Sequence, residues 1–522
     1  DMLFWPTLCR CEHCRRRFTE ETGRAELPLT VNWHDDAWRD FARLRTEWMG
    51  EFAMWATKET RRILGEHITV EHNYASGVAG DWGNGATELV NEACDYTGGD
   101  LYGDLYNHSF TAKYYYNVTM NQPFEYMTVR CDNRLAVHTN SKTEEHLATE
   151  VMLTAAHHGA SFIIDAIDPV GTLDPRVYDR VGKVFERQMP YEKYFSGDMV
   201  QDVAVYYTTT GHYNSRGQNY DNKTCSVNLT RALIEENIPV GVIGNRRTSD
   251  MARYRMVFAP QMAFMDEKNI DDMVRYVENG GVLYLSGVED TKVIERLLGA
   301  RLKEWTDTGM VYMAPTDAGA EIFCDFTAKY PFPTEMSLPV IEVEGAEVMA
   351  TMTFPYTKTG ERKFASIHSN PPGIPSDIPA MVAKKLGRGI VIWSACPIEN
   401  DTRRSHRKLL KNLIARYIDL GALTVRTNAP RQVELVTFQR ADDTLISAVD
   451  LLCTDELLTV PKFTVEVKCA KPERVVRIGG KDRADAEIPF TWADGYVKFD
   501  VDGLVMFDMY RIQYLKVDAL IR

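Results

Sequence analysis

The stretches Phe124-Glu-Tyr-Met-Thr-Val-Arg-Cys131 and Ala160-Ser-Phe-Ile-Ile-Asp-Ala-Ile167 are apolar runs that flank an amphipathic segment over residues 143–157. Short apolar runs rich in β-branched and aromatic residues predict buried strands, and the segment between them predicts a helix. A strand, a helix and a strand in this order form a parallel sheet whose faces are covered by helices. This part of the chain is therefore predicted to have an α/β fold.

The same alternation extends over residues 1–197, which we predict to be one domain. The pattern adds an opening strand that ends near Phe4, strands at 67–73 and 90–95, and helices that end near Leu64 or cover 108–120 and 175–188. The count is then five strands. A closed (β/α)8 barrel, the commonest large fold of this kind, would require three more.

Residues 198–421 are predicted to form a second α/β domain. Its apolar runs lie at 202–207, 239–243, 254–259, 281–285 and 389–394, and a last helix is expected near 402–420. Helical segments between the first four runs predict a flavodoxin-like, doubly wound sheet. The more irregular stretch 300–388 is expected to supply insertions or edge strands.

The last part of the chain, residues 422–522, shows strand-like alternation without a long helical pattern. The clearest alternating runs lie at 433–438, 463–467 and 496–501. Several short strands of this kind predict a small C-terminal β-sandwich.

Composition excludes some classes of function. The 522 residues carry a net charge of −14, and no Lys/Arg run is long enough to form the basic face that nucleic acid requires. No stretch approaches the roughly 20 apolar residues of a membrane span. Seven of the ten cysteines occur singly in apolar contexts, as in a protein of the reducing cytoplasm. We therefore expect a cytoplasmic protein without nucleic-acid or membrane partners.

Particular motifs narrow the class of protein further. The turn Leu8-Cys9-Arg-Cys11-Glu-His-Cys14-Arg-Arg-Arg-Phe18 resembles the one that follows barrel strand four in glycoside hydrolase family 42 and its relatives. The unit that begins at Asp202 is similar to the β-galactosidase trimerisation domain of these enzymes. Three other stretches look closer to glycoside hydrolase family 151, whose characterised activity is α-L-fucosidase: Asn91-Glu-Ala-Cys-Asp-Tyr-Thr-Gly-Gly-Asp-Leu-Tyr-Gly103, Tyr126-Met-Thr-Val-Arg-Cys131 and Ile164-Asp-Ala-Ile-Asp-Pro-Val-Gly-Thr-Leu173.

The resemblance implies a fold and an activity. Residues 1–197 would be strands four to eight of a TIM-barrel catalytic domain, followed by a trimerisation-like domain and a β-sandwich. The chain would then begin inside strand four, with upstream sequence and any targeting signal missing. With five strands of eight, we expect the 522-residue chain alone to lack useful activity.

The activity implied is that of a retaining α-L-fucosidase, which releases terminal fucose from an oligosaccharide or glycoside through a covalent glycosyl-enzyme intermediate. The related enzymes also imply a homo-oligomer, a trimer. Two alternatives stay open. One is a β-galactosidase of the family 42 type, and the other is an inactive carbohydrate-binding or assembly protein.

Retaining glycosidases need two carboxyl groups about 5–5.5 Å apart, which in a barrel come from the carboxyl ends of strands. Asp1 stands at or near the end of strand four, where the resembling fucosidases carry their nucleophile. Glu71 ends the next strand and is the candidate general acid; its alternative is an ordinary pair with a nearby arginine. Glu92 and Asp95 are further candidates for these roles.

Sugar recognition requires planar hydrogen-bonding groups and an aromatic platform. Such side chains lie at or after several predicted strand ends, although each alone is more often structural than ligand-binding. Asp165 is expected to be structural. The candidate substrate-binding residues are His72, Asn73, Trp82, Asp95, Arg130, His138 and Asp168.

Cys9, Cys11 and Cys14 have a thiolate spacing suited to structural zinc, but they supply only three ligands. The resemblance implies that a fourth cysteine lies upstream, and His13 is a less favourable substitute. The alternative is three free cysteines without metal. Hydrolysis by paired carboxylates needs no cofactor, so none is expected for catalysis.

Overall fold

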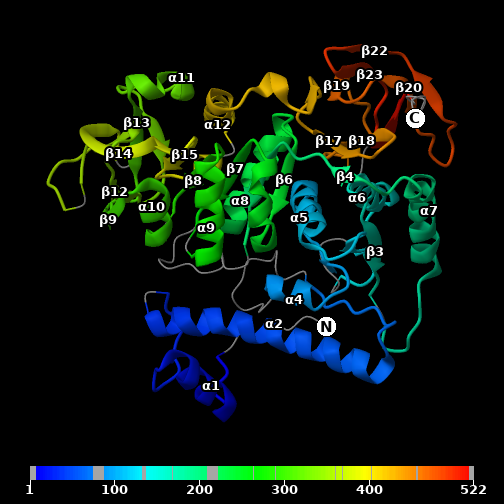
Figure 1. The fold of residues 1–522 in the computed structure, drawn as a ribbon, viewed down its shortest axis with the longest axis horizontal. Coiled ribbons are helices and arrows are strands. Elements are labelled where there is room, and N and C mark those ends of the chain that lie inside the picture. The colour runs from blue at the N-terminus through cyan, green and yellow to red at the C-terminus, as the bar shows by residue number, and fades with distance from the viewer. Residues whose placement is uncertain are drawn as a thin grey trace, which may run out of the picture.

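The computed structural model describes residues 8–33, 35–74, 87–131, 137–166, 168–208, 222–262, 264–288, 290–358, 360–366, 368–400, 403–453 and 457–515. These residues form a mixed α/β molecule with five sheets (Figure 1). In that view, the long helix α2 lies beneath the sheets, and the C-terminal strands lie at the opposite side.

The first part of the chain contains a three-stranded parallel sheet of order β1-β2-β3. Its strands are β1 (Gly98–Asp100), β2 (Glu125–Val129) and β3 (Ala160–Ile164). Its helices are α1 (Glu12–Thr22), α2 (Asp36–Leu64), α4 (Glu88–Glu92), α5 (Leu105–Val118), α6 (Glu144–Ala156) and α7 (Pro175–Glu192). The predicted strand-helix-strand unit is confirmed, because β2 and β3 flank α6 and pair in parallel.

Two of the predicted strands differ in the structure. The prediction at 90–95 is wrong, because Thr87 caps the short helix α4 there and the strand follows only at β1. Residues 68–73 are not assigned as a strand, yet they run beside β1: Asp95 N donates to Val70 O and Tyr74 N to Gly98 O, both at 2.8 Å. The opening strand lies outside the described residues.

A nine-stranded sheet forms the middle of the molecule, in the order β11-β10-β13-β14-β15-β8-β7-β5-β6. Its parallel strands are β5 (Val203–Tyr206), β6 (Val240–Ile243), β7 (Met256–Pro260), β8 (Val282–Ser286) and β15 (Gly389–Ser394). Counted along the chain, their order is 2-1-3-4-5, one of the two common doubly wound orders. All five strands occur where the apolar runs predict them.

The stretch 300–388 extends this sheet with antiparallel strands. They are β10 (Val311–Pro315), β11 (Phe332–Thr334), β13 (Glu347–Pro355) and β14 (Pro372–Leu386), while β9 (Arg301–Trp305) pairs separately with β12 (Pro339–Glu342). The helices of this part are α8 (Asn222–Glu235), α9 (Glu267–Glu278), α10 (Thr291–Leu298), α11 (Ala320–Phe323) and α12 (Arg404–Tyr417), with a 3-10 helix η2 (Asn245–Arg253) after β6.

The C-terminal part consists of two antiparallel sheets that enclose one hydrophobic cluster. One sheet contains β16 (Val425–Thr427), β19 (Phe463–Lys468), β22 (Phe490–Ala493) and β23 (Tyr496–Val501). The other contains β17 (Val433–Gln439), β18 (Asp443–Asp450), β20 (Pro472–Arg477), β21 (Ala486–Ile488) and β24 (Phe507–Tyr514), and β4 (Asp198–Met199) joins its edge. The three predicted strands correspond to β17, β19 and β23.

The helices α5 and α6 attach the first part of the molecule to the other two. One hydrophobic cluster runs from α6 through the nine-stranded sheet to β17 and β18. Inside this contact, Lys113 Nζ donates to Ser109 Oγ at 3.0 Å, contacts His157 Nε2 at 2.7 Å and pairs with Glu434. The opposite face of the three-stranded sheet is therefore the one left for a site. None of the described helices is both long and apolar enough to cross a membrane.

Candidate active site

The segment 68–74 presents alternate side chains to opposite sides. His72 Nε2 lies 2.7 Å from Thr57 Oγ1 on α2, and Tyr74 OH lies 3.1 Å from Tyr114 OH on α5. Asn73 points the other way and donates to Asp100 Oδ2 at 2.9 Å. Glu71, two residues before Asn73, shares its side. We call the face of the three-stranded sheet that Glu71 and Asn73 approach the inner face.

Strand register decides which residues of the sheet belong to the inner face. Gly98 pairs with Glu125, Asp100 pairs with Met127, and Met127 pairs with Phe162. Paired residues of parallel strands point to the same side. Their neighbours Tyr126 and Thr128 are buried against the helices. The inner face therefore carries three carboxyl groups, those of Glu71, Asp100 and Glu125.

Gly98 is what allows two of these carboxyl groups to approach each other. A Cβ atom at this position would lie 3.0 Å from Glu125 Cβ and 3.3 Å from Glu71 Oε1. The oxygens of both glutamates thus occupy the space above a residue without a side chain. They lie level with the start of β1 and β2, so Glu71 is not at the carboxyl end where the sequence placed it, whereas Asp100 and Asn73 lie nearer the carboxyl end of β1.

Burial sets the protonation of Glu71. Burial, and then the negative charge of Glu125, raise the pKa of Glu71 to about 7. Its Oε1 is buried and has no hydrogen-bond partner among the described residues. Burial also raises the pKa of Glu125, whose Oε2 accepts from Tyr96 OH at 3.4 Å. Glu71 can therefore hold a proton near neutral pH, as a general acid must.

Two aromatic side chains lie exposed beside this cluster. Phe162 on the inner face is 49% exposed, and Tyr102, just after the carboxyl end of β1, is 51% exposed. Burial, and then the charge of Asp100, raise the pKa of Tyr102 to about 12, which indicates that its hydroxyl lies near that carboxylate. Exposed rings next to carboxylates offer the platform that the C–H face of a sugar needs.

The structure gives Asp95 a different position from the one predicted. Arg61 donates to its Oδ1 at 2.7 Å and the backbone N–H of Val70 to its Oδ2 at 2.6 Å. The Val70 N–H, and then Arg61, lower its pKa. Asp95 thus fastens the segment 68–74 to α2 before β1 begins, away from Asp100, and a structural role replaces the predicted one. His72, which contacts Thr57, lies on the same side as α2.

Arg130 follows β2 and is 3% exposed. Its Nε donates to Asp165 Oδ1 at 2.5 Å, and its Nη1 donates to Asn140 O at 3.1 Å. Both partners belong to loops after strands, so Arg130 joins two of these loops. The pair agrees with the structural role expected for Asp165, and it leaves Arg130 less free to bind substrate.

The other predicted site residues do not join the inner-face cluster in the described part of the chain. Asp168 is used by its own loop, because its Oδ1 accepts from the backbone N–H groups of Val170 at 2.8 Å and Thr172 at 3.2 Å. His138 is exposed in the turn after β2. The runner-up acid Glu92 is exposed on α4. Asp1 and Trp82 lie outside the described residues, so their predicted roles stay predictions.

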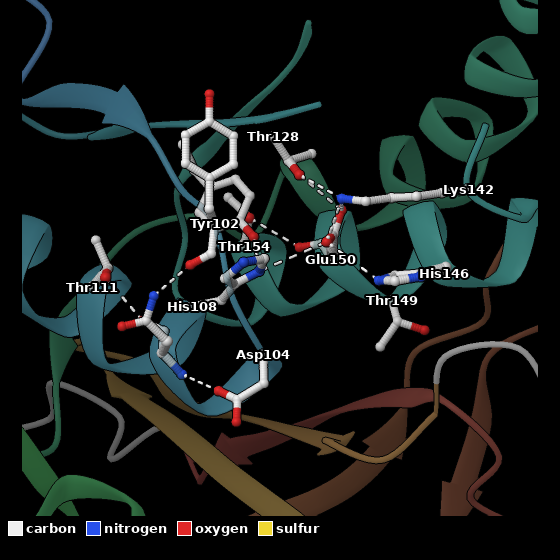
Figure 2. A network of polar contacts seen from close by, with 12 residues as sticks. Tyr102, Asp104, His108, Thr111, Thr128, Lys142, His146, Thr149, Glu150 and Thr154 are labelled. Carbon is white, nitrogen blue, oxygen red and sulfur yellow. Dashed lines mark hydrogen bonds and ion pairs between the residues drawn. The ribbon is translucent and has the colours of Figure 1, made fainter. Parts of the chain in front are cut away.

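A second cluster of ionisable groups lies on the helix side of the sheet and is not a candidate active site (Figure 2). Glu150 on α6 is 1% exposed and accepts from Thr128 Oγ1 at 2.9 Å and from Lys142 Nζ at 2.8 Å. Burial by itself would raise the pKa of Glu150, but His146, His108 and Lys142 together lower it to about 2. A buried carboxylate with this many partners holds β2 against α6.

Sequence reasoning missed Asp100, Glu125, Tyr102 and Phe162. Two signals were present. Alternation along 124–131 places Glu125 and Met127 on one side of the strand and Tyr126 and Thr128 on the other. The second signal is the family-like motif at residues 91–103, which contains Asp100. The strand predicted at 90–95 lies too early in the chain, because β1 begins only at Gly98.

The three clustered cysteines converge around the start of α1. Their Sγ atoms all lie within 4.8 Å of one another. Cys11 caps the helix, and its Sγ accepts from Cys14 N at 3.5 Å. Three sulfurs at this spacing fit a tetrahedral zinc ion with Zn–S bonds of about 2.3 Å. Among the described residues, no fourth ligand completes the set.

Comparisons with known proteins define the class of fold. Residues 202–422 match the family model described as the β-galactosidase trimerisation domain. No curated protein sequence matches the chain. The α-L-fucosidase isoenzyme 2 from Paenibacillus thiaminolyticus has a similar structure, with a TM-score of 0.72 at 16% identity, over 98% of this chain and 77% of that one.

Family 42 enzymes share the fold as well. A catalytic mutant of the GH42 β-galactosidase Gan42B from G. stearothermophilus has a TM-score of 0.67 at 15% identity, over 98% of this chain and 77% of that one. The β-galactosidase from Bacillus circulans sp. alkalophilus has a TM-score of 0.65 at 14% identity, over 94% of this chain and 77% of that one. The predicted resemblance to the glycoside hydrolases related to families 42 and 151 is thereby confirmed at the level of fold and of the trimerisation domain.

Proposed function

We propose that the protein is a retaining glycoside hydrolase whose substrate binds on the inner face of the three-stranded sheet. The observation that carries the proposal is the group of carboxyls Glu71, Asp100 and Glu125 on one exposed face, with a pKa of about 7 for Glu71. A carboxyl group with a pKa near 7 beside a second carboxyl group is the arrangement that glycoside hydrolysis uses.

In this proposal Glu71 protonates the leaving oxygen of the glycosidic bond. Asp100, oriented by the amide of Asn73, lies at the carboxyl end of β1, the end where barrel enzymes build their pockets. Asp1 remains the nucleophile that the resemblance to fucosidases suggests. Among the residues that the structure describes, Asp100 is the alternative nucleophile. Tyr102 and Phe162 would contact the C–H face of the sugar. The sheet β1-β2-β3 with the segment 68–74 would then be strands five to eight of a barrel.

We propose α-L-fucosidase as the activity, with β-galactosidase as the second candidate. The family 151-like motifs favour the first, and both activities occur among the proteins of similar fold. Incubation of the full-length protein with nitrophenyl α-L-fucoside and β-D-galactoside distinguishes them. NMR of the first-formed sugar tests retention: the released anomer keeps the configuration of the substrate if the mechanism is retaining.

Assembly and zinc binding are parts of the same proposal. The matched trimerisation domain supports a homotrimer formed through residues 198–421, which sedimentation at micromolar concentration would reveal. The convergent sulfurs of Cys9, Cys11 and Cys14 support a structural zinc ion that stiffens the turn before α1. The reaction itself needs no cofactor, because carboxyl groups supply both the acid and the nucleophile.

A further inference from the structure

A cavity of about 400 Å³ lies between the first part of the molecule and the nine-stranded sheet. Its walls come from α2, from the start of α4, and from the segments that follow β6 and β7. Figure 1 shows α2 and α4 beneath the ends of these strands. In doubly wound sheets, ligands bind at the carboxyl ends of the strands, near the point where the strand order reverses. The inner-face carboxyls do not line this cavity.

Glu88 enters the cavity from the first turn of α4. It is 5% exposed, and Tyr114 OH donates to its Oε1 at 3.0 Å. Its Oε2 is buried without a hydrogen-bond partner among the described residues. The carboxyl group reaches across to the end of β6, where a Cβ on Gly244 would lie 2.4 Å from Oε1. Only glycine leaves room for this contact, so the approach of Glu88 is built into both domains.

Arg246 supplies a second unsatisfied group to the same cavity. It follows Gly244 at the start of η2, and its Nη1 is buried without a hydrogen-bond partner among the described residues. Leaving a buried charged group unsatisfied is unfavourable, because its desolvation is not compensated. An acceptor and a donor that are both unsatisfied, in a cavity large enough for a small molecule, indicate a ligand that can donate to one and accept from the other.

The charges of the side chains that line the cavity limit the class of ligand that it can bind. The lining holds four carboxylate side chains and three cationic ones, so it has no excess of positive charge. Burial raises the pKa of Glu88 to about 7, although the backbone N–H groups of Asn245 and Arg246 and the charge of Arg246 lower it, and burial also raises the pKa of Asp266. The charges of the lining therefore roughly balance, and a phosphate or another anion would gain no net attraction there. Two neighbouring hydroxyls satisfy both unsatisfied atoms without adding charge, because one donates to Glu88 Oε2 and the other accepts from Arg246 Nη1. Phe264 adds an apolar surface to the wall.

We propose that this cavity is a second carbohydrate site, which holds a neutral mono- or disaccharide between Glu88 and Arg246. The choice of a sugar as the ligand rests on the proposed function, because hydrolysis on the inner face would release a neutral sugar close to this cavity. Bound there, it would join α4 to η2 and so couple the first part of the molecule to the trimerisation-like domain. Accumulated product would then stabilise the contact between the two parts.

The test measures how many sugars bind to each chain. The full-length protein is titrated calorimetrically with D-galactose and with L-fucose, and its structure is determined with the sugar that binds. We expect two sugars per chain and a pyranose between Glu88 and Arg246. Arg246→Met should remove one equivalent, whereas Arg275→Met, which replaces an exposed arginine on α9, should keep both.

A second variant controls for the possibility that Arg246→Met loses binding through misfolding. Thr46→Trp on α2 fills the cavity without removing a buried charge, and it should also abolish one equivalent. Water alone between Glu88 and Arg246, with stoichiometry unchanged in Arg246→Met and Thr46→Trp, would overturn the inference and leave the hydrolase proposal intact. A sugar bound there in a protein that hydrolyses no glycoside would contradict the hydrolase proposal and leave this site standing.

Discussion

Glu71 and Glu125 share the space above Gly98, where a Cβ atom would lie 3.3 Å from Glu71 Oε1 and 3.5 Å from Glu125 Oε1. Two half-buried carboxyl groups this close resist being ionised together. Burial, and then the negative charge of Glu125, raise the pKa of Glu71 to about 7, so this inner-face glutamate can keep a proton near neutral pH.

Replacing Glu71 by Gln should lower kcat/KM about 100- to 10,000-fold, the usual contribution of a general acid. The acid must be protonated, and the pKa of Glu71 is raised to about 7, so wild-type activity should fall as the pH rises through 7. The variant should lack this alkaline limb. Glu66→Gln, an exposed neighbour, is the control and should keep both rate and profile. An unchanged alkaline limb in Glu71→Gln would assign it to another group.

Gly98→Ala should destabilise the protein by about 1–3 kcal/mol, because the added methyl group overpacks the space between the two glutamates. Gly182 in α7 provides a matched control, since a Cβ there meets nothing within 4 Å. Gly182→Ala should stabilise by about 0.5–1 kcal/mol through its helix propensity. Urea unfolding of both variants measures the difference. Equal effects at the two positions would show that the glutamates do not crowd Gly98.

Glu150→Gln should cost about 3–5 kcal/mol, the typical effect of breaking a buried ion pair. His146, His108 and Lys142 outweigh burial, so the pKa of Glu150 in the folded protein is about 2, below the usual value of a glutamate. The stability that the carboxylate contributes is therefore present above pH 4.5 and is lost as the pH falls toward 2. Thermal melts from pH 7 to 3 should show this loss in the wild type and a smaller one in the variant. Glu145→Gln on the same helix should resemble the wild type.

Elemental analysis of protein purified without chelator should find one zinc ion per chain. Cys11→Ser should lose the metal, because three sulfurs within 4.8 Å of one another leave no spare ligand among the described residues. Cys324→Ser, at another exposed cysteine, should retain it. Metal-free wild-type protein with unchanged thermal stability would show that the cluster is three free thiols.

The sequence predicted much of the architecture because strands and helices leave periodic patterns. The parallel strands β2, β3, β5 and β7 appear where apolar runs lie. The run at 90–95 was misread because a short apolar segment fits a strand or a helix equally well. Thr87 favours the helix because its side chain caps α4 by accepting from Leu89 N.

The site was only partly predictable, for a physical reason. Glu71 was identified from its place after an apolar run, and alternation with His72 gives its direction. Its protonation, however, depends on Gly98 and Glu125, which are distant in the sequence and meet it only when the sheet forms. Asp95 was misjudged because its two partners, Arg61 and the Val70 N–H, likewise come together only in the fold.

We propose that the inner-face carboxyls catalyse the hydrolysis of a glycosidic bond. The most direct test is the rate of nitrophenol release from nitrophenyl α-L-fucoside and β-D-galactoside by the full-length protein, compared with its Glu71→Gln and Asp100→Asn variants. We expect hydrolysis of the α-L-fucoside by the wild type and a loss of about 100-fold or more in Glu71→Gln. Absence of hydrolysis of both substrates, or wild-type rates in both variants, would contradict the assignment of the inner face as the active site of a glycoside hydrolase.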